Sequence, residues 1–143
     1  MFSFTTFIIT EVTMTFLDSI KTCLKKTLTI SGRASRSEFW WFQLSFFVIG
    51  IIAALLIVAV GVGSTLASLI SIIFAIYIIV ASIASFTAGI RRLHDTNRSG
   101  WLVLLFWILA CIPFVDIISM IVYIVFLCQK GTDGDNRFGA QPE

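Results

Sequence analysis

The stretch that decides the fold is residues 39–90, FWWFQLSFFVIGIIAALLIVAVGVGSTLASLISIIFAIYIIVASIASFTAGI, a run of 52 consecutive uncharged residues. As a single helix it would be about 78 Å long, whereas the hydrocarbon core of a bilayer is about 30 Å thick. The segment GVGST at 61–65 weakens helix and favours a tight turn. We therefore predict two transmembrane helices, near 39–60 and 66–90, joined by a turn without charge.

The composition of the whole chain agrees with a membrane protein. Of 143 residues, 58% are hydrophobic and 13% are charged, and the mean hydropathy is +1.00. A soluble domain has about 45–50% apolar and about 25% charged residues. The net charge of +2 is too small for a nucleic-acid partner, and one histidine with three cysteines excludes a disulfide framework or a multi-histidine metal site. We expect no cofactor and no metal.

A second apolar block runs from Trp101 to Cys128 and is interrupted only by Pro113 and Asp116. It fits either one long kinked helix or a hairpin that turns at 112–116. An aspartate at the bilayer centre costs roughly 2.5–3.5 kcal/mol, so we favour the hairpin, which moves Asp116 toward the interface, where its carboxylate can cap the next helix. Its arms, near 100–112 and 117–129, would be short, at about 18 Å.

The predicted fold is therefore all-α: a polytopic membrane helical bundle of four transmembrane helices in two hairpins. The alternative, with one kinked helix in the second block, has three spans. Basic residues orient the chain, because cytoplasmic loops carry an excess of lysine and arginine. Five precede the first span and three follow the second, whereas the turn between has none. Four spans then leave both termini cytoplasmic, with Trp40, Trp41 and Trp101 at that interface as an aromatic belt.

The region before the first span predicts a surface helix. Its apolar residues recur every four positions and its lysines lie off that row, as in an amphipathic helix on a membrane surface: Phe16, Ile20, Leu24 and Leu28, against Lys21, Lys25 and Lys26. Residues 1–13 lack the basic start and cleavage site of a signal peptide. We interpret them as a non-native or disordered extension, with Met1 or Met14 as the true start, and residues 14–143 as a single membrane domain.

Three polar motifs punctuate the apolar segments: GRASRSEFWWF at 32–42, RRLHDTNRSGW at 91–101 and GDNRFG at 134–139. Through these motifs and the spacers between them, residues 14–143 resemble the bacterial inner-membrane family catalogued as domain of unknown function 805. The resemblance implies a multi-pass inner-membrane protein and no established activity. The second motif departs from the family pattern at Asn97, where glycine is more frequent, but asparagine also tolerates left-handed backbone angles.

All six arginines of the chain lie in the three motifs. If the motifs converge, their forked guanidinium groups can hold a phosphate or carboxylate bidentately, most obviously the headgroup of an anionic phospholipid. The alternative is that the arginines pair with the acidic residues Glu38, Asp95, Asp133 and Asp135 and pin the loops together. The candidate anion-binding residues are Arg33, Arg36, Arg91, Arg92, Arg98 and Arg137.

Two further patterns concern helix ends and helix packing. Ser35 and Glu38 have the spacing of a capping box at the start of the first span. Seven residues recur three and four positions apart along the second span, and all but Ile78 are small, so they form a seam for close helix packing, within the bundle or in a homo-oligomer. The small residues of that seam are Ser68, Ser71, Ala75, Ser82, Ser85 and Gly89.

These features favour a non-enzymatic membrane protein whose arginine-rich cytoplasmic face engages anionic lipid headgroups or a protein partner. The alternative is a small transporter or channel subunit that uses Asp116 and the serine seam. A membrane enzyme that uses His94 and Asp95 is a third hypothesis, disfavoured because adjacent residues of a helix do not face each other. No nucleophile motif accompanies them.

Overall fold

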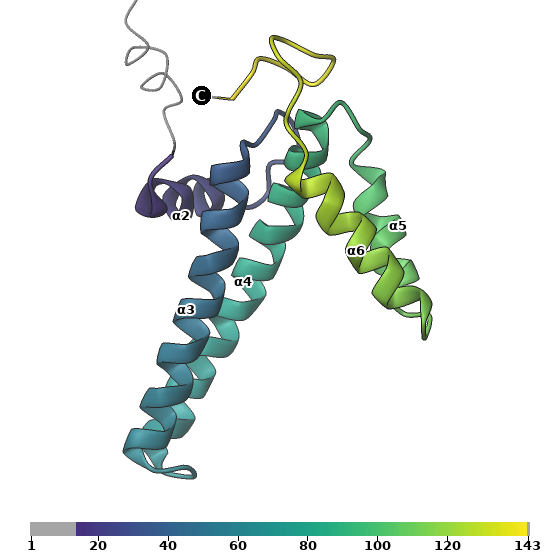
Figure 1. The fold of residues 1–143 in the computed structure, drawn as a ribbon. Coiled ribbons are helices and arrows are strands. Elements are labelled where there is room, and N and C mark those ends of the chain that lie inside the picture. The colour runs from purple at the N-terminus through teal and green to yellow at the C-terminus, as the bar shows by residue number, and fades with distance from the viewer. Residues whose placement is uncertain (1–13, 143) are drawn as a thin grey trace, which may run out of the picture.

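The computed structural model describes residues 14–142, and within them it contains five α-helices and no strand beyond an isolated bridge between Asn136 and Gly139. The all-α class is confirmed, whereas the prediction for residues 1–13 lies outside the described residues. Figure 1 shows a long hairpin, a shorter hairpin against its upper part, and one helix lying across the first. The helices are α2 (Phe16–Lys25), α3 (Arg36–Val60), α4 (Thr65–Asp95), α5 (Trp101–Leu109) and α6 (Val115–Cys128).

The long hairpin α3–α4 forms where the uncharged run predicted it. Ser35 caps α3, accepting a hydrogen bond from the Glu38 amide at 3.1 Å, and Ser64 caps α4. The turn between them uses Gly61 and Gly63 at φ +88° and +90°, where a side chain would be strained. With 25 and 31 residues, α3 and α4 are about 37 and 46 Å long.

Both helices have the length and composition to span a membrane. Only 11% of the residues in the most apolar part of each are buried. The central helix of a soluble protein would instead be mostly buried, so the apolar surface of α3 and α4 is suited to contact with lipid.

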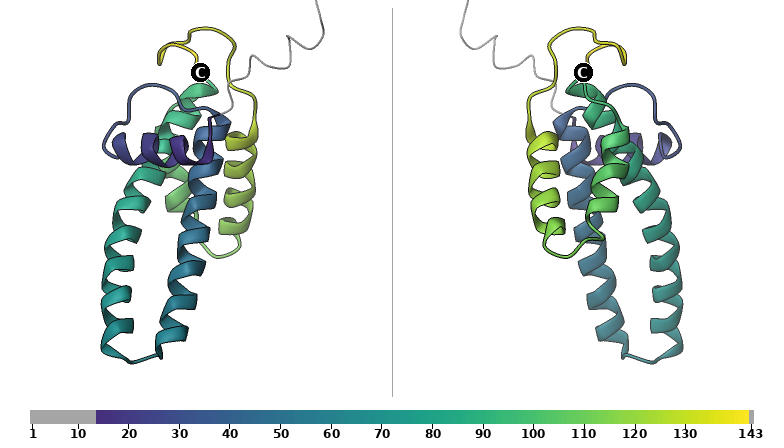
Figure 2. Two further views of the ribbon diagram at one scale, coloured as in Figure 1. Left: turned by 90° about the vertical axis from the view of Figure 1, so that its left-hand side faces the viewer. Right: turned by 90° about the vertical axis from the view of Figure 1, so that its right-hand side faces the viewer.

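The short hairpin α5–α6 confirms the predicted turn but not the predicted lengths. The two helices run antiparallel, and Figures 1 and 2 show their tip well short of the α3–α4 tip. With 9 and 14 residues they are about 14 and 21 Å long, less than the roughly 30 Å hydrocarbon core. The structure therefore supports two membrane-spanning helices and leaves four spans unconfirmed.

The turn of the short hairpin also differs from its prediction. Residues 110–114 all lie between the helices, so the turn begins earlier than expected. Phe114, at φ +68°, occupies the position before α6, and the structure gives it no side-chain capping bond. Asp116 lies inside the first turn of α6 rather than at its cap. The predicted cap is wrong because the left-handed Phe114 shifts the helix start.

The seam predicted on α4 is used only at its upper end. Ser68, Ser71, Ala75 and Ser82 are exposed, whereas Gly89 is buried. A Cβ atom on Gly89 would lie 2.6 Å from the Tyr123 hydroxyl, so this glycine sets the close approach of α6. The α4 residues of the hydrophobic core are instead a row of alanines, Ala81, Ala84 and Ala88, together with Leu93. A seam function in self-association remains a prediction.

Helix α2 forms as predicted and packs across α3 with a polar contact. Thr15 caps it, and its buried residues are Ser19 and Cys23. The Ser19 hydroxyl donates to the Glu38 carbonyl at 2.6 Å. Two residues of the expected apolar row are exposed: Leu24, within α2, is 39% exposed, and Leu28, just after the helix, is 85% exposed. These two residues are available to contact lipid.

The short length of the α5–α6 hairpin leads to a prediction about Cys111, an exposed residue in the turn between the two helices. In a chain with Cys23→Ser and Cys128→Ser, we expect Cys111 to resist a membrane-impermeant maleimide applied from either side of sealed vesicles, because a short hairpin ends within the hydrocarbon. Val62→Cys in the α3–α4 turn is the positive control and should react from one side. Reaction of Cys111 from that same side would show that the hairpin crosses the bilayer.

Candidate functional site

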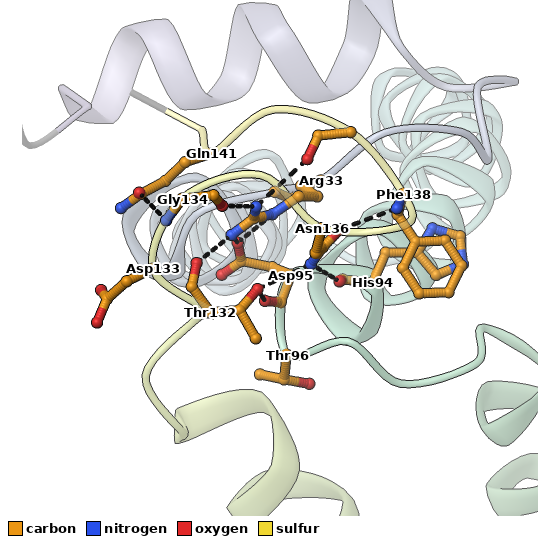
Figure 3. Close-up of polar contacts among 12 residues, drawn as sticks. Arg33, His94, Asp95, Thr96, Thr132, Asp133, Gly134, Asn136, Phe138 and Gln141 are labelled. Carbon is orange, nitrogen blue, oxygen red and sulfur yellow. Dashed lines mark hydrogen bonds and ion pairs between the residues drawn. The ribbon is translucent and has the colours of Figure 1, made fainter.

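The three polar motifs converge at one end of the molecule, where the start of α3, the end of α4 and the C-terminal loop meet (Figure 3). Asp95 lies at the centre. Its Oδ1 accepts from Arg33, with Nε at 2.9 Å and Nη2 at 2.8 Å, and its Oδ2 pairs with Arg92 Nη1. The side chains are 1%, 0% and 5% exposed for Arg33, Arg92 and Asp95. A buried carboxylate thus joins arginines from the first and second motifs.

The third motif wraps the guanidinium of Arg33. Arg33 donates to three carbonyls of the C-terminal loop: Thr132 at 2.5 Å, Gly134 at 2.6 Å and Gly139 at 3.3 Å. Thr132 closes the ring, because its amide and its hydroxyl both donate to the Asp95 carbonyl, at 2.8 and 3.0 Å. Arg33 therefore links all three motifs through one planar group.

Arg92 ties the end of the short hairpin to the same cluster. Its Nε donates to the Leu127 carbonyl at 2.9 Å and its Nη2 to the Gln129 carbonyl. These carbonyls lie in and just after the last turn of α6, where backbone acceptors have no partner within the helix. One guanidinium thus both pairs with Asp95 and satisfies the end of α6.

Gly131 is required for the loop to pass this close. A Cβ atom at that position would lie 2.1 Å from Asp95 Oδ2. Asn136 then holds the returning loop, donating from Nδ2 to the His94 carbonyl at 2.9 Å and to the Thr132 hydroxyl at 2.8 Å. Asn136 belongs to the third motif, and Gly131 and Thr132 lie just before it, but their roles depend on contacts with residues about 40 positions earlier in the chain.

His94 is engaged in the same packing. Its ring stacks on Phe138 with centroids 3.9 Å apart and an interplanar angle of 4°, and its Nδ1 lies 3.2 Å from the Gly32 carbonyl. The Asp95 carboxylate faces Arg33 and Arg92 instead. His94 and Asp95 are therefore not arranged as an acid–base pair in this structure.

A second ion pair lies beside the first, beneath α2. Arg91 Nη1 pairs with Glu38 Oε1, and both side chains are almost fully buried. The Ser35 cap is as predicted, but this pairing means that Glu38 faces Arg91, so the reciprocal half of the capping box is wrong. Burial and then the Glu38 carboxylate raise the pKa of the neighbouring Cys23 thiol to about 12. Cys23 is thus protonated at neutral pH.

The six motif arginines accordingly divide into two groups. Arg33, Arg91 and Arg92 are buried in ion pairs with Asp95 and Glu38, as in the alternative that arginines pin the loops. Arg36 and Arg137 are exposed and Arg98 is half-buried. Arg98 lies over the Phe126 ring at 4.2 Å, and Arg137 donates to the Asn97 carbonyl at 3.1 Å. Only the second group is accessible to a ligand.

The remaining candidate residues lie elsewhere. Asp116 lies at the tip of the short hairpin, at the opposite end of α6 from the cluster, and its Oδ1 is buried without a hydrogen-bond partner among the described residues. Asn97 has φ +58°, the left-handed angle that its place in the second motif allows. Within residues 14–142, no three His, Cys, Asp or Glu side chains gather as a metal ligand set.

The long helices expose apolar surfaces, and ion pairs between residues of the motifs join them at one end. This arrangement is that of a helical membrane protein. A family described as a protein of unknown function, DUF805, matches residues 27–140, and the chain belongs to this family. The resemblance inferred from the motifs is therefore confirmed.

Two inner-membrane proteins of Escherichia coli are similar to the chain. YhaI is 36% identical over 120 residues, which cover 84% of this chain and 91% of YhaI. YhaH is 40% identical over 124 residues, which cover 84% of this chain and 92% of YhaH. No solved structure matches. These relatives support a location in the bacterial inner membrane.

The central role of Asp95 predicts that Asp95→Asn destabilises the protein strongly. Removing one partner of a buried ion pair costs about 3–5 kcal/mol because the remaining charge stays buried. We expect a lower free energy of unfolding in detergent titrated with dodecyl sulfate, and faster tryptic cleavage after Lys130 and Arg137 as the loop detaches. Asp133→Asn is the matched control, since the Asp133–Lys130 pair is 76% and 69% exposed and contributes little. Equal stability of the two variants would contradict the role of Asp95.

Proposed function

We propose that the protein is a non-enzymatic, multi-pass inner-membrane protein with cytoplasmic termini, whose cytoplasmic end binds anionic phospholipid headgroups. The supporting observation is the charge at the end of the molecule where the motifs meet. Among residues 14–142 and outside the buried pairs, this end carries seven basic residues against the acidic Asp18, Asp133 and Asp135. The basic residues are Lys21, Lys25, Lys26, Arg36, Arg98, Lys130 and Arg137.

The distribution of these charges supports the proposed orientation. The opposite end of the long hairpin, the turn 61–64, has no charged residue. Cytoplasmic segments carry the excess of lysine and arginine. Trp40, Trp41 and Trp101 are 37%, 40% and 77% exposed near the basic end, as expected for aromatic side chains at a headgroup interface.

Buried and exposed arginines would have different tasks in this proposal. The buried group has its charge neutralised within the fold, whereas Arg36 and the lysines of α2 are exposed. Each basic residue near an anionic surface contributes about 1 kcal/mol of attraction. A protein partner with an acidic surface could use the same residues, and the test below separates the two.

The proposal predicts that the protein prefers anionic over zwitterionic lipid, and that this preference comes from the exposed basic residues and not from the buried arginines. Purified protein offered phosphatidylglycerol and phosphatidylcholine should retain more phosphatidylglycerol in native mass spectrometry. A fourfold variant removes four of the exposed charges: Lys21→Gln, Lys25→Gln, Lys26→Gln and Arg36→Gln. In this variant the ratio of bound phosphatidylglycerol to bound phosphatidylcholine should fall by at least about tenfold. Arg36→Lys with the lysines intact is the charge-conserving control.

Raised salt should weaken the preference of the unmodified protein, because exposed charges are screened within about 8–10 Å. A preference that survives the fourfold substitution would contradict headgroup binding by these residues. Binding of an acidic protein, with no lipid preference, would favour the partner instead.

The alternative function is a small transporter or channel subunit that uses Asp116 and the serine seam. The buried, unpartnered Oδ1 of Asp116 is the observation that favours it, since ionisable groups within a membrane commonly mark ion pathways. Ion flux in proteoliposomes that is lost in Asp116→Asn, with lipid preference retained, would support this alternative over the proposal.

A further inference from the structure

A groove lies between the two hairpins and is lined by residues of α3, α4, α5 and α6. Its volume is about 240 Å³ and it is partly open to the surroundings. An apolar cavity of about 150 Å³ already admits a benzene molecule, so this groove has room for a longer hydrocarbon segment. It is too small for another helix, whose diameter with side chains is about 10–12 Å. Its walls include Phe46 of α3, Ser82 of α4, Trp107 of α5 and Tyr123 of α6.

Polar groups lie among these aromatic walls. The Ser85 hydroxyl donates to Gln43 Oε1 at 2.7 Å, which leaves the amide nitrogen of Gln43 as a further donor. Neither that nitrogen nor the Tyr123 hydroxyl has a hydrogen-bond partner among residues 14–142. In hydrocarbon, an unsatisfied polar group costs several kcal/mol. The groove is therefore suited to a ligand that brings a hydrogen-bond acceptor to this level.

The depth of the polar groups matches the anatomy of a phospholipid. Gln43 is seven residues along α3 from Arg36, Ser85 is six residues before Arg91, and Tyr123 is five before the end of α6. At 1.5 Å per residue, they lie about 8–10 Å below the basic end. A glycerophospholipid places its phosphate at the interface, its ester carbonyls below it and its hydrocarbon deeper still.

We propose that the groove binds one acyl chain of a membrane glycerophospholipid, whose ester carbonyl accepts hydrogen bonds from Gln43 and Tyr123. This deepens the proposed function and rests on it for the headgroup, since the basic residues above the groove complement a phosphate. The acyl chain occupies the space beside Phe46 and Trp107. Gly89 contributes by admitting the Tyr123 hydroxyl close to α4.

Photocrosslinking tests the acyl-chain site. The full protein is reconstituted in vesicles of phosphatidylcholine, a small fraction of which carries a diazirine in one acyl chain. This lipid has no net headgroup charge, so the test does not depend on a preference for anionic lipid. We expect adducts concentrated on Phe46, Trp107 and Tyr123. Ser82→Phe, which places a ring in the groove, should reduce them by about tenfold. Ser71→Phe, on an exposed part of the same helix, is the matched control and should leave them unchanged.

A second comparison tests the hydrogen bonds without adding bulk. Unlabelled diester phosphatidylcholine should compete with the probe better than its diether analogue, which lacks the carbonyl. Tyr123→Phe should abolish this difference and keep the fold.

Equal adducts in Ser82→Phe and Ser71→Phe, adducts spread evenly over the lipid-facing surface, or no difference between diester and diether would overturn the proposal. Crosslinks from the groove to a second copy would do so too. The fourfold charge variant should keep its phosphatidylcholine adducts, so headgroup binding can fail while the groove site stands. Ser82→Phe should likewise keep the preference for phosphatidylglycerol.

Discussion

The fold depends on neutralising one buried carboxylate. Asp95 is the last residue of α4, at the negative end of the dipole of a 31-residue helix. Burial and the dipole both disfavour its charge. Two guanidinium groups compensate: Arg92, one helical turn earlier, and Arg33, 62 residues earlier in the chain. The local pair alone would fix nothing beyond α4. The distant pair fixes the start of α3 against the end of α4.

Pairing the carboxylate creates a further demand that the rest of the chain meets. Arg33 and Arg92 have more donors than Asp95 has oxygen atoms, and a buried donor without a partner is costly. The backbone supplies the acceptors, from the C-terminal loop for Arg33 and from the end of α6 for Arg92. In lipid, no hydrophobic effect drives one helical hairpin onto another. These polar contacts at the helix ends therefore have a large share in placing the short hairpin.

Much of the helical fold could be predicted from the sequence, because it follows from local properties. The uncharged run, the glycines at 61 and 63 and the Ser35 cap specify α3 and α4 independently of distant residues. The sequence could not show which acidic residue pairs with which arginine, since Glu38, Asp95, Asp133 and Asp135 all lie in or near the motifs and carry the same charge. The cap at Asp116 failed for a related reason: the left-handed angle of Phe114 is not encoded by its residue type. The seam was predicted as one row, but the short hairpin reaches only its upper end.

The short hairpin also explains why a groove exists. The ion pairs fix the hairpins together at the basic end, and Gly89 allows α6 to approach α4 closely there. Farther from that end, bulky aromatic side chains such as Phe46 and Trp107 line the space between the hairpins. The two hairpins are joined at the basic end, and farther from that end these aromatic side chains keep the helices apart. The hairpins therefore do not pack against each other along their whole length. A space that opens into hydrocarbon is filled by hydrocarbon, since leaving it empty forfeits dispersion contacts. In the proposed lipid site, the buried arginines would thus determine where an acyl chain enters, and the exposed basic residues would lie where its phosphate is.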